Sequence, residues 1–122
     1  MFKGSIVALL TPFKDNKLDE ENYINLIHYH LKNGTHGIVP GGTTGESPTL
    51  SYDEHRKIIE ISVRETKGKI PVISGTGSNS TSEAVELSKF AESAGTNGLL
   101  IVTPYYNKPT QEGLYQHYKK IN

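Results

Sequence analysis

Short apolar runs and amphipathic stretches alternate four times along this chain of 122 residues. The apolar runs are rich in Val, Ile and Leu and predict four strands, at residues 5–10, 37–40, 70–74 and 98–102. Between them, apolar side chains recur every three or four positions and predict four helices, over 20–32, from 51 to near 68, from 80 to 95, and from 110 onward. The pattern is βαβαβαβα, which is typical of an α/β protein with a parallel sheet.

Serine and glycine residues mark the ends of these helices. Ser51 is followed three positions later by Glu54, a capping box in which each side chain satisfies a backbone amide of the other residue. Ser80 and Glu83 have the same spacing, so a second capping box is expected at the third helix. Gly95 is expected to end that helix, because glycine readily adopts the left-handed conformation that follows a helix.

The predicted strands are continuous apolar runs, which indicates a sheet that is buried on both faces and covered by helices. Polar and small residues gather where these strands end, at 11–12, 41–47, 75–77 and 103–107. The carboxyl ends of parallel strands meet at one edge of a sheet, where α/β enzymes build their sites. This one-sided clustering predicts a small-molecule site.

The loop at 41–47, Gly-Gly-Thr-Thr-Gly-Glu-Ser, is the most informative part of this edge. It joins a strand to a helix through small residues, so its backbone N–H groups are open to a ligand. Such a turn is typical of anion binding, although many glycine-rich turns are only tight connections.

Composition excludes several classes of protein. Lys plus Arg and Asp plus Glu both number 13, which leaves no basic face for nucleic acid or anionic lipid, and the absence of cysteine favours a cytoplasmic protein. Only five apolar residues, 6–10, follow Lys3, too few for a signal peptide or a membrane span. His28 and His30 point to different sides of a helix, and Gly75-Thr76-Gly77 lacks a third glycine, so neither a metal nor a dinucleotide cofactor is expected.

These motifs, in this order, resemble the N-terminal part of the dihydrodipicolinate synthase (4-hydroxy-tetrahydrodipicolinate synthase) family, in the pyruvate-dependent aldolase superfamily that includes N-acetylneuraminate lyase. The matching motifs are residues 4–8, 11–12, 42–47, 53–55, 75–77, 103–109 and 111–115. The resemblance implies a TIM (β/α)8 barrel, which usually takes about 250 residues. We therefore expect residues 1–122 to form one partial barrel, its N-terminal half of about four βα units.

The resemblance also implies a lyase that condenses pyruvate with L-aspartate 4-semialdehyde through a lysine Schiff base, the entry to the diaminopimelate route of lysine biosynthesis. By motif position, Thr43 and Thr44 would hold the pyruvate carboxylate through backbone N–H groups, and the Thr43 hydroxyl would join a proton relay. Tyr106 matches the relay tyrosine that reaches across a dimer interface into the neighbouring site. The family implies a homotetramer, built as a dimer of dimers, with no separate cofactor.

Lysine-inhibited members of the family have an inhibitor pocket at the dimer interface. The positions that match it are Ser47, His55, Asn79, Glu83 and Tyr105. Pro48 and Tyr52 depart from the commoner Ala and His of that pocket. Apart from the resemblance, His55 is expected on the surface of its helix.

In the family the Schiff-base lysine lies on the sixth strand, and a second relay tyrosine and a carboxylate-binding arginine follow the fifth. None of these positions falls within the four βα units, so the isolated chain is expected to be inactive, and marginally stable or self-associating. Three alternatives stay open: a sister aldolase of the N-acetylneuraminate lyase type, against which residues 105–107 argue; a non-catalytic anion-binding α/β module; and a remnant that never accumulates.

Overall fold

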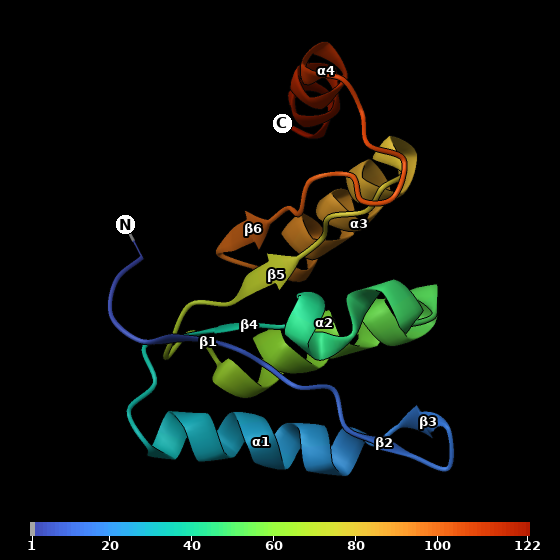
Figure 1. Cartoon of the computed structure of the whole chain (residues 1–122). Coiled ribbons are helices and arrows are strands. Elements are labelled where there is room, and N and C mark those ends of the chain that lie inside the picture. Colours follow the sequence, from blue (N-terminus) through green and yellow to red (C-terminus); the bar gives the residue numbers. More distant parts are fainter. Residues whose placement is uncertain (1) are drawn as a thin grey trace.

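The computed structural model describes residues 2–122 and contains one sheet of four parallel strands with helices beside it (Figure 1). The strands are β1 (Ile6–Ala8), β4 (Gly37–Val39), β5 (Ile73–Gly75) and β6 (Gly98–Leu100). The helices are α1 (Glu20–Lys32), α2 (Tyr52–Thr66), α3 (Thr81–Ala94) and α4 (Gln111–Ile121). The predicted order βαβαβαβα is thus confirmed, with strands shorter than the apolar runs. Within this part of the chain no helix is long and apolar enough to cross a bilayer.

The four strands follow one another across the sheet in chain order. β1 pairs with β4, and β5 pairs with β6, both in parallel. A parallel bridge between Ile38 and Val72 joins the two pairs, and the Gly75 amide donates to the Pro40 carbonyl at 2.8 Å. In Figure 1 the helices succeed one another in the same direction, from α1 at the bottom to α4 at the top. Because the strands are parallel, the carboxyl ends of all four lie along one edge of the sheet.

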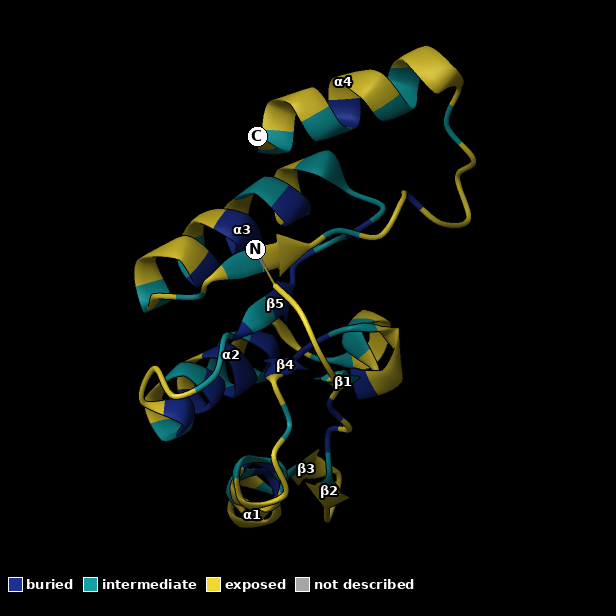
Figure 2. Cartoon of the chain, turned by 90° about the vertical axis from the view of Figure 1, so that its left-hand side faces the viewer, coloured by how far each residue is buried: buried dark blue, intermediate teal, exposed yellow. Residues whose placement is uncertain are grey.

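The main apolar core lies between the sheet and the first two helices. Leu9, Ile38 and Val72 from the strands and their ends pack against buried side chains of α1 and α2, among them Ile27 and Ile58. Burial of each such aliphatic side chain contributes roughly 1.5–3 kcal/mol. A smaller cluster joins α2 to α3, and Figure 2 shows their buried positions on the sides that face the strands, whereas α4 is mostly exposed.

The other face of the sheet is exposed, whereas the sequence predicted burial on both faces. Leu10, Leu100 and Val102 are exposed by 61%, 53% and 43%. The continuous apolar runs predict strands covered on two sides, but residues 2–122 cover only the face that packs against the helices. Exposed apolar side chains beside the edge strands β1 and β6 agree with the predicted tendency to self-associate, which stays a prediction.

Most of the predicted helix ends are confirmed. The Ser51 hydroxyl accepts from the Glu54 amide at 3.2 Å, and the Ser51 amide donates to the Glu54 carboxylate at 2.9 Å, which completes the first capping box. α3 ends at Gly95, whose φ is +92°.

The second predicted capping box is wrong. The Ser80 side chain makes no capping bond to α3. Instead, Ser78 two residues earlier donates its hydroxyl to the Glu83 carboxylate at 2.8 Å and accepts from the Ser80 amide at 3.1 Å. The Ser78 hydroxyl thus stands between the Ser80 amide and the Glu83 carboxylate, which a capping box would join directly.

A small hairpin follows β1. β2 (Phe13–Lys14) and β3 (Lys17–Leu18) pair in antiparallel fashion. Asp15 and Asn16 between them have φ values of 52° and 59°, as in the two-residue turns that match the twist of a hairpin.

Candidate active site

The polar segments predicted at the strand ends do come together. Thr11, after β1, is buried and donates its hydroxyl to the Gly45 carbonyl at 2.7 Å, which ties the first strand to the loop after β4. The amide of Thr76, after β5, donates to the Leu100 carbonyl of β6 at 3.1 Å. The loop at 41–47 therefore lies within a continuous polar edge.

Residues 41–47 form a tight turn. Gly41 has a φ of +65°, and a short 3₁₀ helix, η1, spans Thr43–Gly45. Inside the turn the Gly45 amide donates to the Gly42 carbonyl and the Glu46 amide to the Thr43 carbonyl, both at 3.0 Å. The turn is thus held by its own backbone.

The amides of Thr43 and Thr44 at the start of this turn have no acceptor among residues 2–122. Both residues are exposed at the surface of the chain. Free amides at the beginning of a helical turn are the groups that bind a carboxylate or phosphate oxygen. The turn therefore leaves two backbone donors free, and their role in binding an anion stays a prediction.

A cavity of about 400 Å³ opens beside this turn, within the usual range of small-molecule pockets. One side is formed by the turn itself, with Gly42 and Thr43. Leu100 and Val102 give the cavity apolar lining, and Tyr105 also lines it. An anion bound at the turn would have its carbon skeleton against this apolar lining.

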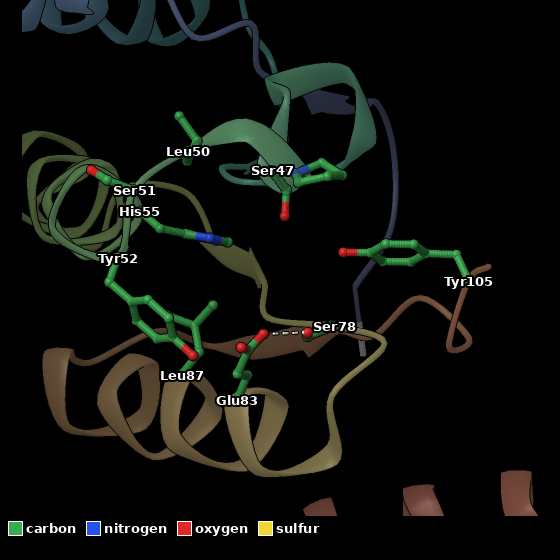
Figure 3. A pocket seen from close by; sticks show the side chains of 11 residues that line it. Ser47, Leu50, Ser51, Tyr52, His55, Ser78, Glu83, Leu87 and Tyr105 are labelled. Carbon is green, nitrogen blue, oxygen red and sulfur yellow. Dashed lines mark hydrogen bonds between the residues drawn. The ribbon is translucent and has the colours of Figure 1, made fainter. Parts of the chain in front are cut away.

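A second, smaller cavity of about 100 Å³ adjoins the first, and Figure 3 shows the side chains that point into it from three segments. Ser47, His55, Glu83 and Tyr105, four of the five positions predicted for an inhibitor pocket, line it. The fifth, Asn79, does not line it, and its carbonyl accepts from the Asn107 side chain at 3.4 Å.

The two cavities share one wall. Ser47, Pro48, Gly77 and Tyr105 line both of them. A ligand in the smaller cavity would therefore contact residues that also bound the larger one.

His55 is buried, with 7% of its surface exposed, so the expectation of a surface histidine is wrong. Its Nε2 lies 2.8 Å from the Gly75 carbonyl oxygen, which can only accept, so Nε2 carries the proton. Burial lowers the pKa of His55 below its ordinary value, and the hydrogen bond to Gly75 opposes this only in part. The imidazole is neutral near pH 7.

The burial of His55 has a signal in the sequence, in the residues that follow it along α2. Ile58, Ile59 and Ser62 come three, four and seven positions later, and all are fully buried. These spacings put His55 on the helix face that packs against the sheet. No sequence pattern predicts that His55 meets the Gly75 carbonyl.

The structure does not bring Tyr106 into the cavity beside Thr43. Its side chain is 93% exposed, and Tyr106 is not among the residues that line this cavity. Its φ of +69° is uncommon for a tyrosine and directs the backbone away from a regular path.

The histidines of α1 take separate partners. His28 Nε2 lies 3.0 Å from the Glu65 carboxylate, and His30 Nδ1 lies 3.1 Å from the Thr35 hydroxyl. Across the described residues no group of three or more His, Cys, Asp or Glu side chains is placed to hold a metal ion.

Comparison with known proteins identifies the family. A model of the Dihydrodipicolinate synthetase family matches residues 1–122, the whole chain. The chain belongs to this family. The 4-hydroxy-tetrahydrodipicolinate synthase of Pelagibacter ubique is 69% identical to it over 122 residues, which are 100% of this chain and 42% of that protein. The chain thus spans less than half the length of the synthases that it matches.

Solved dihydrodipicolinate synthases have the same fold over this length. The chloride-inhibited enzyme from Acinetobacter baumannii, complexed with pyruvate, is 52% identical, with a TM-score of 0.96 over 99% of this chain and 42% of that one. The enzyme from Cyanidioschyzon merolae with lysine bound is 41% identical, with a TM-score of 0.94 over 98% of this chain and 41% of that one. The four βα units are the N-terminal half of the TIM barrel of this family, as the sequence predicted.

Proposed function

We propose that this chain forms the pyruvate-binding part of a 4-hydroxy-tetrahydrodipicolinate synthase, which condenses pyruvate with L-aspartate 4-semialdehyde. The observation that carries the proposal is the turn at 41–47, where the amides of Thr43 and Thr44 have no acceptor among residues 2–122 and Thr43 lines a cavity at the carboxyl edge of the sheet. The likeness to a relative complexed with pyruvate supports the choice of ligand.

Pyruvate suits this cavity because its two ends differ. Its carboxylate would accept hydrogen bonds from the amides of Thr43 and Thr44, and its methyl end would lie toward Leu100 and Val102. In the proposed reaction a lysine amine attacks the ketone carbon, a C–N bond forms, and the ketone oxygen leaves as water. The resulting Schiff base gives the enamine that attacks the aldehyde.

The proposed mechanism needs groups from outside these 122 residues. The family's Schiff-base lysine lies on the sixth strand of the barrel, whereas residues 2–122 contain the first four. The Thr43 hydroxyl would pass protons to a tyrosine, and Tyr106, exposed on its own chain, would serve a neighbouring subunit. A homotetramer, as a dimer of dimers, is part of this proposal.

The smaller cavity supports a second function, binding of lysine as an inhibitor. Four of the residues predicted for that role line it, and Glu83 supplies a carboxylate for an ammonium group. Its volume of about 100 Å³ is below the 300–1,000 Å³ typical of ligand pockets, so the proposal includes a second wall from a partner subunit. Pro48 and Tyr52, which differ from the commoner residues of the family's pocket, line the part of the cavity that this chain provides.

A chimera tests the proposed activity. Residues 1–122 are joined to the remaining C-terminal part of the P. ubique enzyme, which is 69% identical over the replaced segment. We expect turnover of pyruvate with aspartate semialdehyde, and borohydride trapping of a pyruvate adduct on lysine. The isolated 122-residue chain should trap none.

The same assay separates the alternatives. Activity of the chimera with N-acetylneuraminate in place of aspartate semialdehyde would favour a sister aldolase. Binding of pyruvate or phosphate by the isolated chain, combined with an inactive chimera, would favour a non-catalytic anion-binding module.

A further inference from the structure

Three segments that are distant in the sequence meet at His55. Its Nε2 lies 2.8 Å from the Gly75 carbonyl at the end of β5. A Cβ atom built on Gly41 would overlap the same Nε2, so the imidazole packs directly against the backbone at the entrance of the turn. The Gly75 amide in turn donates to the Pro40 carbonyl at 2.8 Å.

We infer that His55 is a positioning residue for the turn at 41–47, here called the substrate turn. It acts through Gly75 and Gly41 on the amides of Thr43 and Thr44. The inference rests on the proposed function, because it assigns His55 to the same pyruvate site. His55 itself does not line the larger cavity, so its effect is exerted through the backbone.

The turn needs an external support at this end. Its internal hydrogen bonds begin at Gly42 and fix its shape, but they do not fix where the turn stands relative to the sheet. The far end is attached by the Thr11 hydroxyl to the Gly45 carbonyl. Among the described residues, the near end is attached through Pro40 and the contact between Gly41 and His55.

The geometry requires a donor at the position of Nε2. The Gly75 carbonyl must be satisfied because Gly75 is buried, and a buried carbonyl without a donor is costly. Glutamine can place its amide N–H where Nε2 stands, whereas asparagine, one methylene shorter, ends near the position of Nδ1. The two substitutions have the same chemistry and differ in reach, which makes them a matched pair.

Hydrogen exchange in the 122-residue chain tests the support directly. In His55→Asn the Gly75 amide, which donates to the Pro40 carbonyl at the near end of the turn, should exchange about tenfold faster, while the central amides of α2 keep their protection. In His55→Gln all of these amides should stay within about twofold of the wild type. Equal exchange in the two variants, loss of protection throughout α2 in both, or an unprotected Gly75 amide in the wild type would overturn the inference.

Pyruvate binding gives the functional measurement. In the chimera, His55→Asn should raise the KM for pyruvate about tenfold and leave the KM for aspartate semialdehyde within about threefold, and His55→Gln should restore the wild-type value. A wild-type chimera that neither binds nor traps pyruvate would refute the proposed function, while the exchange experiment would still decide the role of His55. Normal pyruvate KM in His55→Asn would refute the inference alone.

Discussion

The hydroxyl of Thr11 donates a 2.7 Å hydrogen bond to the carbonyl oxygen of Gly45, 34 positions further along the chain. Both groups are buried, and the bond joins the end of the first strand to the turn after the second parallel strand. A Cβ atom at Gly45 would lie 2.9 Å from the Leu9 carbonyl and 3.2 Å from this hydroxyl, so the two segments are in close contact. One side chain thus anchors the far end of the turn at 41–47.

Replacement of Thr11 tests this anchor. Thr11→Val keeps the shape of the side chain but leaves the Gly45 carbonyl without its donor, and we expect a loss of about 1–3 kcal/mol in the free energy of unfolding. Urea denaturation of the chimera measures it. Thr11→Ser keeps the hydroxyl and should lose less, and equal losses in the two variants would show that the methyl group matters instead.

The end of β5 should tolerate no side chain. A Cβ atom at Gly75 would overlap the Gly41 carbonyl oxygen, a backbone atom that cannot move aside alone, so Gly75→Ala should destabilise the protein by several kcal/mol, on the order of 2–4. Gly42→Ala is the matched control, because its nearest neighbour lies at 3.8 Å. Thermal unfolding should separate the two variants clearly, and a similar melting temperature for both would contradict the close approach of Gly75 to Gly41.

The stability of the protein should fall as the pH drops below 6.5, the ordinary pKa of histidine. Because burial lowers the pKa of His55 in the folded state, the unfolded chain takes up a proton first and is favoured. The loss begins near pH 6.5 and stops growing once the pH falls below the folded-state pKa. Denaturation at a series of pH values between about 7.5 and 5 spans this window and gives the free energy of unfolding at each. This free energy should depend less on pH in His55→Gln than in the wild type. An unchanged dependence would show that other groups cause the loss of stability.

Thr43 is expected to act through both its amide and its hydroxyl, and substitution can separate the two. Thr43→Val keeps the backbone amide, so the KM for pyruvate in the chimera should change by less than about threefold, while kcat falls about 100-fold because the proton relay is broken. Thr43→Ser should recover most of kcat. A large rise in KM without loss of kcat would assign the hydroxyl to binding.

Much of the fold could be predicted because its signals are local. The bounds of α1, the capping box of Ser51 and Glu54, and the end of α3 at Gly95 all depend on residues within a few positions of one another. The failed capping box at Ser80 shows where such reasoning stops, since Ser78 competes for the same partners through a loop conformation that spacing does not specify.

The candidate site was predicted in part for the same reason. Residues 41–47 could be recognised from their order, and parallel strands bring their carboxyl ends together whatever the details of packing. The pairing of Thr11 with Gly45, and of His55 with Gly75, could not be recognised, because these residues are 34 and 20 positions apart.

Periodicity and motif order were enough to establish the alternation of strands and helices, the family, and the edge of the sheet where the site lies, because both are properties of neighbouring residues. Three features required the folded chain: His55 contacts Gly41 and Gly75, the helices cover just one face of the sheet in residues 2–122, and two cavities share a wall. These features arise from distances between segments, and such distances exist only once the helices have packed against the sheet.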